Sequence, residues 1–328
     1  MKQTLTDANF PRTADLRVYH LGLRPGEVAN RIITVGSPSR AEGIAKLLDK
    51  DLQPFVLSSE RGFLTITGRF NGVPVSIVSI GMGSPNMDFF VREVRECISG
   101  DLLIVRLGSC GGLKGATVGS VVLPKASVAI TRNVDYDFVN PENCQEPAYR
   151  VSKPVAADPL LHQEIHKAIL SVKPPQSKAV IVTNTVNASA DSFYSSQGRQ
   201  TSFPDHNEHL IEQLQASIHD VGTLEMETFH LFHLAKCWSG LQSGGDLSEG
   251  AGSVPPLTTN AVKPVISKPA PSTTQVEREQ PALAGRDTTI KAAAIQMVFA
   301  SRTSQGFITP TEVSDLEGWT GKVSSLGS

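Results

Sequence analysis

Apolar residues along the first 235 or so positions form short continuous runs that alternate with segments of helical periodicity. Residues 31–35 and 102–105 are runs of strand length with glycine soon after them, which is typical of strands buried on both faces. Ser39 is a candidate cap for a helix over residues 40–48, where apolar side chains recur at helical spacing. Similar patterns predict further strands at 118–123, 126–131 and 178–182, and further helices at 160–171, 207–219 and 228–236.

A hairpin is predicted where the dipeptide Asn71-Gly72 separates two apolar runs, residues 63–70 and 73–80. Asn-Gly readily adopts the backbone of a two-residue turn between antiparallel strands. Residues 81–85 then interrupt the second run and start a helix that extends to about residue 98. Strands that alternate with helices predict an α/β fold with a mainly parallel or mixed central sheet, in which ligands bind at the carboxyl ends of strands.

The character of the sequence changes after Trp238. Residues 239–298 contain no aromatic side chain and are rich in Pro, Ser, Gly and Thr. Such a composition buries too little apolar surface to offset the entropy of ordering the chain. We therefore expect a flexible low-complexity insertion at 240–285, after which an ordered pattern resumes at 291–299. An interdomain linker is the weaker alternative, because the roughly 40 residues that follow are too few for an independent domain.

The chain has 328 residues, and its 30 Lys and Arg nearly balance its 32 Asp and Glu, for a formal net charge of -2. This length fits two domains or one large domain with additions. Near-neutral charge argues against a nucleic-acid or anionic-membrane partner, because both attract a basic surface. The sequence has no apolar run of about 18 residues, so we expect no transmembrane helix. Its polar N-terminus lacks the apolar core of a secretion signal.

The four cysteines are spaced too widely for a structural zinc site, and they suggest reduced thiols in a cytoplasmic protein. They are Cys97, Cys110, Cys144 and Cys237. The sequence contains neither an HExxH motif nor a His/Cys cluster, so we expect no metal site. It also lacks the GxSxG motif of many serine hydrolases.

Two segments are candidates for binding an anion. Residues 36–40 form a glycine turn that opens a helix, where backbone N–H groups and Arg40 can bind phosphate; an ordinary strand-to-helix turn is the alternative. Arg106 follows four apolar residues of a predicted strand and precedes a predicted glycine turn, 108–112, which contains Ser109. A buried arginine needs a partner, so either a bound anion or a core carboxylate is expected beside it.

Two further segments suit a nucleoside. Phe193, Gln197 and Arg199 combine an aromatic face, an amide that donates and accepts, and a guanidinium, which together match a uracil-like ring. A polar surface loop is the alternative. Glu225 and Glu227 flank a methionine at a helix entrance, where they suit sugar hydroxyls or simply favour the helix dipole.

Each segment is a weak signal, but their order and spacing resemble the nucleoside phosphorylase-I family and, within it, the uridine phosphorylases. The resemblance runs from about residue 18 to 236 and resumes from about 291 to 303. The matching segments are residues 18–23, 36–40, 59–61, 81–85, 106–109, 192–199, 224–227 and 301–303. A purine-specific relative is expected to carry an aspartate near Arg302, whereas the pair Gln197 and Arg199 favours a pyrimidine.

This resemblance implies a single three-layer α/β/α domain over residues 1–328 with a central mixed β-sheet. It also implies reversible phosphorolysis of uridine to uracil and ribose 1-phosphate, with phosphate as a co-substrate and no cofactor. By matching position, phosphate is bound by Gly36, Arg40, Arg106 and Ser109, ribose by Met226 and Glu227, and uracil by Phe193, Gln197 and Arg199. The catalytic set is Arg106, Arg199, Gln197 and Glu227.

The resemblance further implies a homo-oligomer whose sites are shared across a dimer interface. Arg61 is expected to reach the phosphate of the neighbouring subunit's site, and His20 the 5′-hydroxyl of its ribose. Gly62 stands where bacterial members have a glutamate that helps to hold a potassium ion, so no metal is expected. Ser37 replaces an aspartate of the phosphate turn, and Ser109 replaces a threonine but keeps the hydroxyl.

Three alternatives stay open at this point. They are a nucleoside hydrolase of the same fold, a purine nucleoside phosphorylase, and a non-catalytic nucleoside-binding or storage relative. The three matching arginines Arg40, Arg61 and Arg106 argue against a hydrolase, which needs no phosphate cage.

Overall fold

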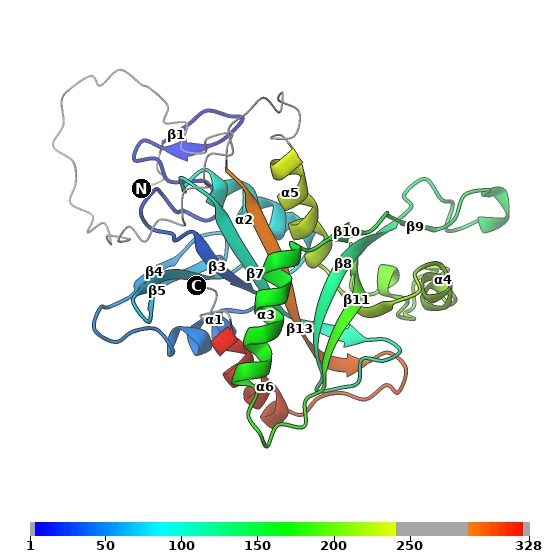
Figure 1. Ribbon diagram of the computed structural model, residues 1–328. Coiled ribbons are helices and arrows are strands. Elements are labelled where there is room, and N and C mark those ends of the chain that lie inside the picture. Colours follow the sequence, from blue (N-terminus) through cyan, green and yellow to red (C-terminus); the bar gives the residue numbers. More distant parts are fainter. Residues whose placement is uncertain (1–3, 241–287, 324–328) are drawn as a thin grey trace, which may run out of the picture.

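A computed structural model describes residues 4–240 and 288–323 of the chain (Figure 1). The predicted low-complexity insertion, residues 240–285, lies outside the described residues except for Gly240. It therefore stays a prediction. Within the described ranges, no helix combines the length and apolar character needed to cross a membrane.

An eleven-stranded mixed sheet forms the centre of the molecule, and a separate two-stranded sheet joins β1 (Leu5–Thr6) to β2 (Arg12–Thr13). The strands of the large sheet are β3 (Arg31–Val35), β4 (Phe55–Ser58), β5 (Leu64–Phe70), β6 (Val73–Ser79), β7 (Leu102–Gly112), β8 (Val121–Arg132), β9 (Tyr149–Val151), β10 (Val155–Ala156), β11 (Ile181–Ala190), β12 (Val221–Glu225) and β13 (Ile290–Ser301).

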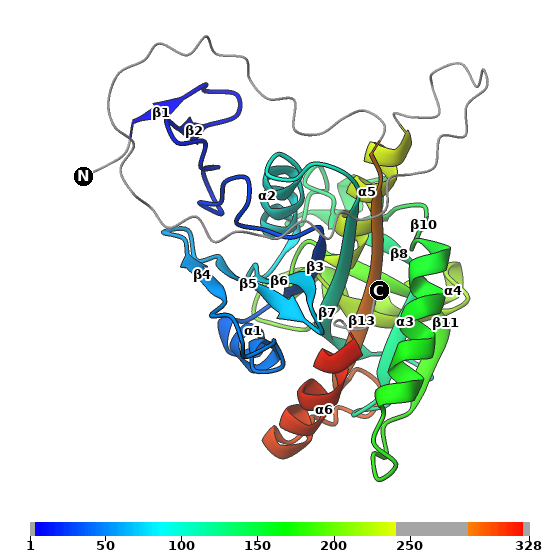
Figure 2. The same cartoon turned by 60° about the vertical axis from the view of Figure 1, so that its left-hand side comes forward.

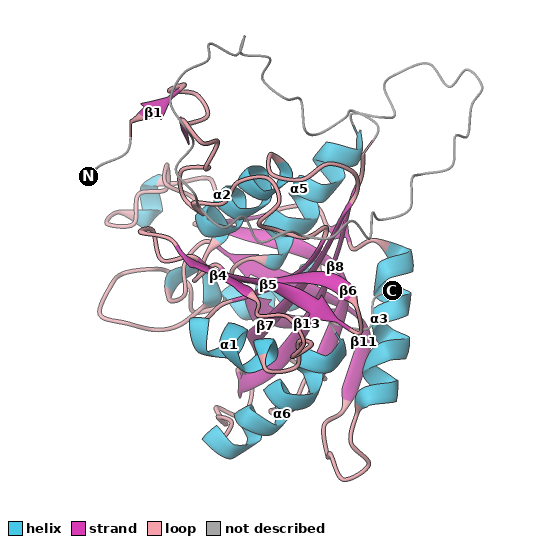
Figure 3. Ribbon diagram, turned by 90° about the vertical axis from the view of Figure 1, so that its left-hand side faces the viewer, coloured by secondary structure: helices cyan, strands magenta, loops and turns pink. Residues whose placement is uncertain are grey.

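Helices cover both faces of this sheet. They are α1 (Pro38–Ala45), α2 (Ser84–Arg95), α3 (Pro159–Val172), α4 (Leu210–Ser217), α5 (Thr228–Gly240) and α6 (Pro310–Val323). Alternate strand residues point to opposite sides: Ile32 and Ile104 pack with α2 and α5, whereas Ile33 and Val105 pack with α1, α3 and α6. Figure 3 shows the sheet between α2 and α5 on one side and α1 and α6 on the other. The α/β fold with a mixed central sheet between helices is confirmed.

Part of the sheet closes on itself through β13. This strand runs parallel to β7 along nearly its whole length and also pairs with β8. Strand β8 pairs with β11, β11 with β12, and β12 returns to β7, which completes a ring of five strands. Figure 2 shows β7 and β13 side by side in the middle of the molecule. A strand near the C-terminus thus holds a central place in the sheet.

The hairpin prediction is confirmed, since β5 and β6 are antiparallel and Asn71 and Gly72 have positive φ angles of 48° and 80°. Several other element predictions need correction. Helix α1 is capped by Ser37, whose hydroxyl accepts from the Arg40 N–H at 3.3 Å, and not by Ser39, because Pro38 already occupies the first helical turn. The helix ends at Ala45.

The predicted strands 118–123 and 126–131 are one strand, β8. Pro124 between them falls opposite a register shift in β11, so its missing N–H does not interrupt the ladder. The predicted strand at 178–182 is the start of β11, which begins at Ile181 and extends to Ala190.

The glycine turn predicted at 108–112 is also wrong, because these residues continue strand β7. Their glycines allow close approach instead. A Cβ on Gly111 would lie 3.4 Å from the Arg302 side chain, and a Cβ on Gly112 would lie only 2.0 Å from the carbonyl oxygen of Ala116. Glycine at these positions leaves room for the Arg302 side chain and the Ala116 backbone to pack directly against the strand.

Candidate active site

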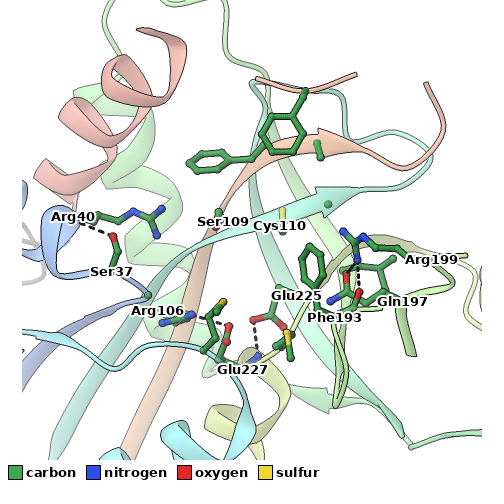
Figure 4. A pocket seen from close by; sticks show the side chains of 18 residues that line it. Ser37, Arg40, Arg106, Ser109, Cys110, Phe193, Gln197, Arg199, Glu225 and Glu227 are labelled. Atoms are coloured by element: carbon green, nitrogen blue, oxygen red, sulfur yellow. Dashed lines mark hydrogen bonds and ion pairs between the residues drawn. The ribbon is translucent and has the colours of Figure 1, made fainter. Parts of the chain in front are cut away.

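A cavity of about 320 Å³ lies where the carboxyl ends of several strands meet, as the α/β pattern predicts (Figure 4). Every predicted site residue except His20 and Arg61 lines it. These residues are Gly36, Arg40, Arg106, Ser109, Phe193, Gln197, Arg199, Met226 and Glu227. Segments far apart in the sequence therefore converge on one space that is large enough for a small polar molecule.

Arg106 lies on β7 at the floor of this cavity, and it is 4% exposed. Its Nη2 donates to Glu227 Oε2 at 2.7 Å. Its Nε and Nη1 are buried and have no hydrogen-bond partner among the described residues. The expected core carboxylate is therefore present on one nitrogen, whereas the bound anion stays a prediction for the two nitrogens without a partner.

Arg40 approaches the cavity from α1 and is also buried. Its Nε donates to Glu317 Oε1 at 2.7 Å, and its guanidinium lies 5.7 Å from the centre of the Phe299 ring. Burial lowers the pKa of Arg40, and the charge of Arg106 lowers it further, whereas Glu317 raises it. Two cations thus lie close together at one end of the cavity, which is an arrangement that a phosphate would stabilise.

The two carboxylates before α5, Glu225 and Glu227, have different hydrogen-bond partners. Glu227 accepts from the Gly83 N–H at 2.5 Å as well as from Arg106. Glu225 accepts from the N–H groups of Glu227 and Thr228, each at 2.9 Å, and so satisfies the first donors of the helix. The helix-terminus interpretation therefore holds for Glu225, and burial raises its pKa. Glu227 is the carboxylate that pairs with Arg106 at the cavity.

Most groups at the opposite end of the cavity come from one short segment, residues 193–199. Arg199 Nη1 donates to Gln197 Oε1 at 2.5 Å and to the carbonyl oxygen of Phe193 at 2.6 Å. Its guanidinium also lies 3.8 Å from the centre of the Phe193 ring. Arg302 from the end of β13 donates to the carbonyl oxygens of Gln197 and Gly198, at 3.0 and 3.1 Å. Burial and the charge of Arg302 lower the pKa of Arg199 to about 10.

Several lining residues were not predicted from the sequence. They are Met82, Cys110, Gly111, Leu224, Phe299, Ala300 and Phe307, and they give the cavity much of its apolar surface. Met82 and Leu224 fall inside segments that matched the family pattern, 81–85 and 224–227, so their positions carried a usable signal. Phe299 and Phe307 lie in and after β13, where no spacing pointed to a site. Burial raises the pKa of the Cys110 thiol well above its usual value, which keeps it uncharged.

His20 and Arg61 lie outside the cavity of their own chain. The His20 ring stacks on Phe89 at 3.8 Å, and its Nδ1 lies 2.6 Å from Glu93 Oε1. Arg61 is exposed, hydrogen-bonds the Tyr19 hydroxyl and lies over the Tyr19 ring. Their expected roles concern a second copy of the chain, so these roles stay predictions.

Among the residues that the structure describes, no three His, Cys, Asp or Glu side chains come together in a way that would hold a metal ion.

The chain matches known proteins in sequence. The model of the phosphorylase superfamily matches residues 30–242. A uridine phosphorylase of Thermococcus kodakarensis is 29% identical over 248 residues, which are 74% of this chain and 80% of the relative. A DeoD-type purine nucleoside phosphorylase of Roseobacter denitrificans is 25% identical over 217 residues, which are 66% of this chain and 80% of the relative.

Solved structures give a similar result. A structure from a study of two diverse uridine phosphorylases in the oomycete Phytophthora capsici is 34% identical, with a TM-score of 0.78, and the match covers 98% of this chain and 97% of that one. A nucleoside phosphorylase of Trypanosoma brucei is 18% identical, with a TM-score of 0.65 and coverage of 96% and 98%. At 18% identity, this second similarity shows a shared fold.

Proposed function

The chain belongs to the phosphorylase superfamily, and from that premise we propose that it is a uridine phosphorylase, a pentosyltransferase that splits uridine with inorganic phosphate into uracil and ribose 1-phosphate. One observation carries the proposal. A buried arginine with two unpartnered nitrogens, Arg106, lies at one end of the same cavity that has Gln197 and Arg199 at the other. An anion and a pyrimidine can therefore bind side by side.

Phosphate is assigned to the end formed by Gly36, Arg40, Arg106 and Ser109. Arg106 Nε and Nη1 supply donors that have no partner, and a phosphate oxygen would satisfy them. Arg40 adds a second buried cation, and Arg61 of a neighbouring subunit would add a third. A dianion between arginines is favoured both by charge and by the fork geometry of guanidinium.

Ribose is assigned to Met226 and Glu227, between the two ends, with His20 of a neighbouring subunit on the 5′-hydroxyl. Glu227 has a carboxylate at the cavity that accepts hydrogen bonds, so it suits the 2′- and 3′-hydroxyls. Its pairing with Arg106 would tie the position of the sugar to that of the phosphate.

Uracil is assigned to Phe193, Gln197 and Arg199. Gln197 donates and accepts at once, as a ring with one carbonyl and one N–H requires, and Arg199 donates to a second carbonyl oxygen. The half-exposed Phe193 ring offers an aromatic face for the base.

Cleavage of the N-glycosidic bond gives the ribose oxocarbenium character and puts negative charge on the base. In the proposed reaction, phosphate is the nucleophile, so no covalent enzyme intermediate is formed. Arg40 and Arg106 hold the phosphate in place, which is catalysis by positioning. Arg199 and Gln197 stabilise the charge that develops on uracil, which is an electrostatic contribution to the leaving group.

The proposal extends to how and where the protein acts. We propose a homo-oligomer with sites shared across a dimer interface, no resident cofactor or metal, and a role in pyrimidine salvage in the cytoplasm. The pairing of Arg61 with Tyr19 on the surface supports the shared site, because it keeps an exposed guanidinium oriented in the absence of a substrate.

The test is the release of free base from uridine, thymidine, 2′-deoxyuridine and inosine, with and without phosphate, followed by absorbance. We expect uracil to appear from uridine only when phosphate is present. Release without phosphate would identify a hydrolase, and base release from inosine in preference to uridine would identify a purine enzyme. A thermal shift with uracil but no turnover would favour a nucleoside-binding protein.

A further inference from the structure

Helix α6 contains no residue that the sequence singled out, yet it reaches the phosphate end of the cavity. Glu317, on the third turn of this helix, accepts from Arg40 Nε at 2.7 Å. The exposed fractions of the two side chains are 28% for Glu317 and 8% for Arg40. This ion pair joins residues that are 277 positions apart in the sequence.

The packing of α6 holds the Glu317 carboxylate in place. Leu316 and Trp319, on either side of it in the sequence, are buried in the core that α6 shares with α1 and α3. Gly321 lets α6 approach α1 closely, because a Cβ there would come within 3.0 Å of the Ile44 side chain. The carboxylate is therefore presented by a packed helix, and a small shift of α6 would move it.

The hydrogen bond to Glu317 uses the Nε of Arg40 and leaves the terminal nitrogens for other partners. Nη1 makes one long contact of 3.4 Å with the carbonyl oxygen of Leu107. Figure 4 shows the Arg40 guanidinium directed toward the cavity, on the same side as Arg106. A guanidinium fixed at Nε presents its outer edge in one orientation, as bidentate binding of phosphate requires.

The two arginines repel each other when no anion lies between them. Each has its own carboxylate: Glu227 pairs with Arg106, and Glu317 pairs with Arg40. Without a counter-charge, a buried arginine is costly and turns toward water. The ion pair with Glu317 therefore keeps the Arg40 guanidinium at the cavity before phosphate binds.

We propose that Glu317 is a positioning residue for inorganic phosphate: through Nε, it fixes the Arg40 guanidinium in the orientation that binds the phosphate. This inference rests on the proposed function, because it assumes that phosphate is the anion at this end. The rival interpretation is that Glu317 competes with phosphate for Arg40. The two predict opposite effects when the carboxylate is removed.

Two substitutions separate the hydrogen bond from the charge. Glu317→Gln keeps an oxygen that can accept from Arg40 Nε but removes the negative charge, and Glu317→Ala removes both. Asp315→Ala is the matched control, because Asp315 is an exposed acid on the same helix. The measurements are KM for phosphate and for uridine, kcat, the thermal midpoint, and the Kd for inorganic phosphate by calorimetry without nucleoside.

We expect Glu317→Ala to raise the phosphate KM and Kd by about 10-fold, the scale for one hydrogen bond between charged groups. The uridine KM should change less than twofold. Glu317→Gln should recover most of the phosphate affinity, and Asp315→Ala should behave as the wild type. A general loss of structure would instead lower the thermal midpoint and affect both substrates.

Tighter phosphate binding in either Glu317 variant would overturn the inference in favour of competition. It is also overturned if Glu317→Ala leaves the phosphate Kd unchanged, or if Glu317→Gln is as weak as Glu317→Ala. A wild type that binds phosphate but does not cleave uridine would contradict the proposed function, while the calorimetry would still decide the role of Glu317. A wild type that binds no phosphate would overturn both.

Discussion

The two ends of the cavity are built in different ways. At the phosphate end, Arg40 and Arg106 come from α1 and β7, and each is paired with a carboxylate far away in the sequence. At the base end, Phe193, Gln197 and Arg199 lie within seven residues and contact one another. The side chains of the phosphate end are therefore paired across the fold. Those of the base end pair within one local segment, and Arg302 adds a distant contact to its backbone.

Exposure differs among the side chains within each end. Arg106 and Gln197 are 4% and 2% exposed, whereas Phe193 is 47% exposed. Buried charges are costly to leave unpaired, so the phosphate end combines binding with stability. We therefore expect substitutions of the buried arginines there to affect both activity and folding, whereas substitution of Phe193 or Arg199 should affect activity with little change in stability.

The largest expected effect is that of Arg106→Ala. Removing this donor should lower kcat/KM for uridine phosphorolysis by about 1000-fold, the upper range for one electrostatic donor. It leaves the Glu227 carboxylate buried without its partner, which should lower the free energy of unfolding by about 3–5 kcal/mol. Steady-state kinetics and urea unfolding measure the two effects.

Two comparisons sharpen this prediction. The double variant Arg106→Ala, Glu227→Gln should regain part of the stability, since no unpaired charge remains, but none of the activity. Arg92→Ala removes an exposed arginine on α2 and should cost less than about 1 kcal/mol. An Arg106→Ala variant within 10-fold of the wild-type activity would show that phosphate binds elsewhere.

Arg199→Ala tests the base end. We expect kcat to fall by about 100-fold or more, because the donor that stabilises charge on uracil is lost. The uridine KM should rise by less than that, and the thermal midpoint should change little, since the partners of Arg199 are local. A change confined to KM would mean that Arg199 binds uracil without stabilising the leaving group.

Glu227→Gln tests the middle of the cavity. Glutamine keeps an oxygen that can accept from Arg106, so the phosphate end is disturbed less than by alanine. We expect the kcat/KM for uridine to fall about 10-fold more than that for 2′-deoxyuridine, the scale for one hydrogen bond to a charged group. Equal losses for the two nucleosides would remove Glu227 from recognition of the 2′-hydroxyl.

The smallest expected effect compares two phenylalanines. Phe193→Leu removes the ring that lies 3.8 Å from Arg199. Contacts of this kind contribute about 0.5–1 kcal/mol when exposed, so the uridine KM should rise by about two- to fivefold. Phe299→Leu, beside Arg40, should change the phosphate KM more than the uridine KM. The reverse pattern in steady-state kinetics would show that the two ends of the cavity do not bind uracil and phosphate separately.

The same division explains which parts of the site the sequence could predict. Phe193, Gln197 and Arg199 stand close together in the chain, so their spacing was enough to suggest a ring-binding segment. Arg106 was recognisable as a charge at the end of an apolar run. Its partner Glu227 was not identifiable as such, because ion pairs between distant elements leave no local pattern.

The fold was predicted on similar terms. Apolar runs and the Asn71-Gly72 turn predicted β3, β5 to β8 and part of β11, and helical periodicity predicted the helices α1 to α5. The strands β1, β2, β4, β9, β10 and β12 were not predicted, and the glycines of 108–112 suggested a turn where β7 continues. Helix α6 was missed. Gly318 and Gly321 lower its helix propensity. The close packing of Gly321 against α1 accounts for the second glycine, but this packing is a tertiary contact that leaves no pattern in the local sequence. Its contribution to the site, Glu317, was therefore missed with it.

The central position of β13 has a consequence for how the protein is made. Strands β7 and β8 leave the ribosome long before the strand that joins them, so their edges lack this partner during synthesis. At ~5–20 residues per second, translation from the end of β8 to the end of β13, residues 133–301, takes roughly 8–34 seconds. Unpaired strand edges invite association with other chains during that interval. The nascent chain is thus most vulnerable to aggregation just before the sheet closes, and a chaperone that shields the β7 edge would act in that window.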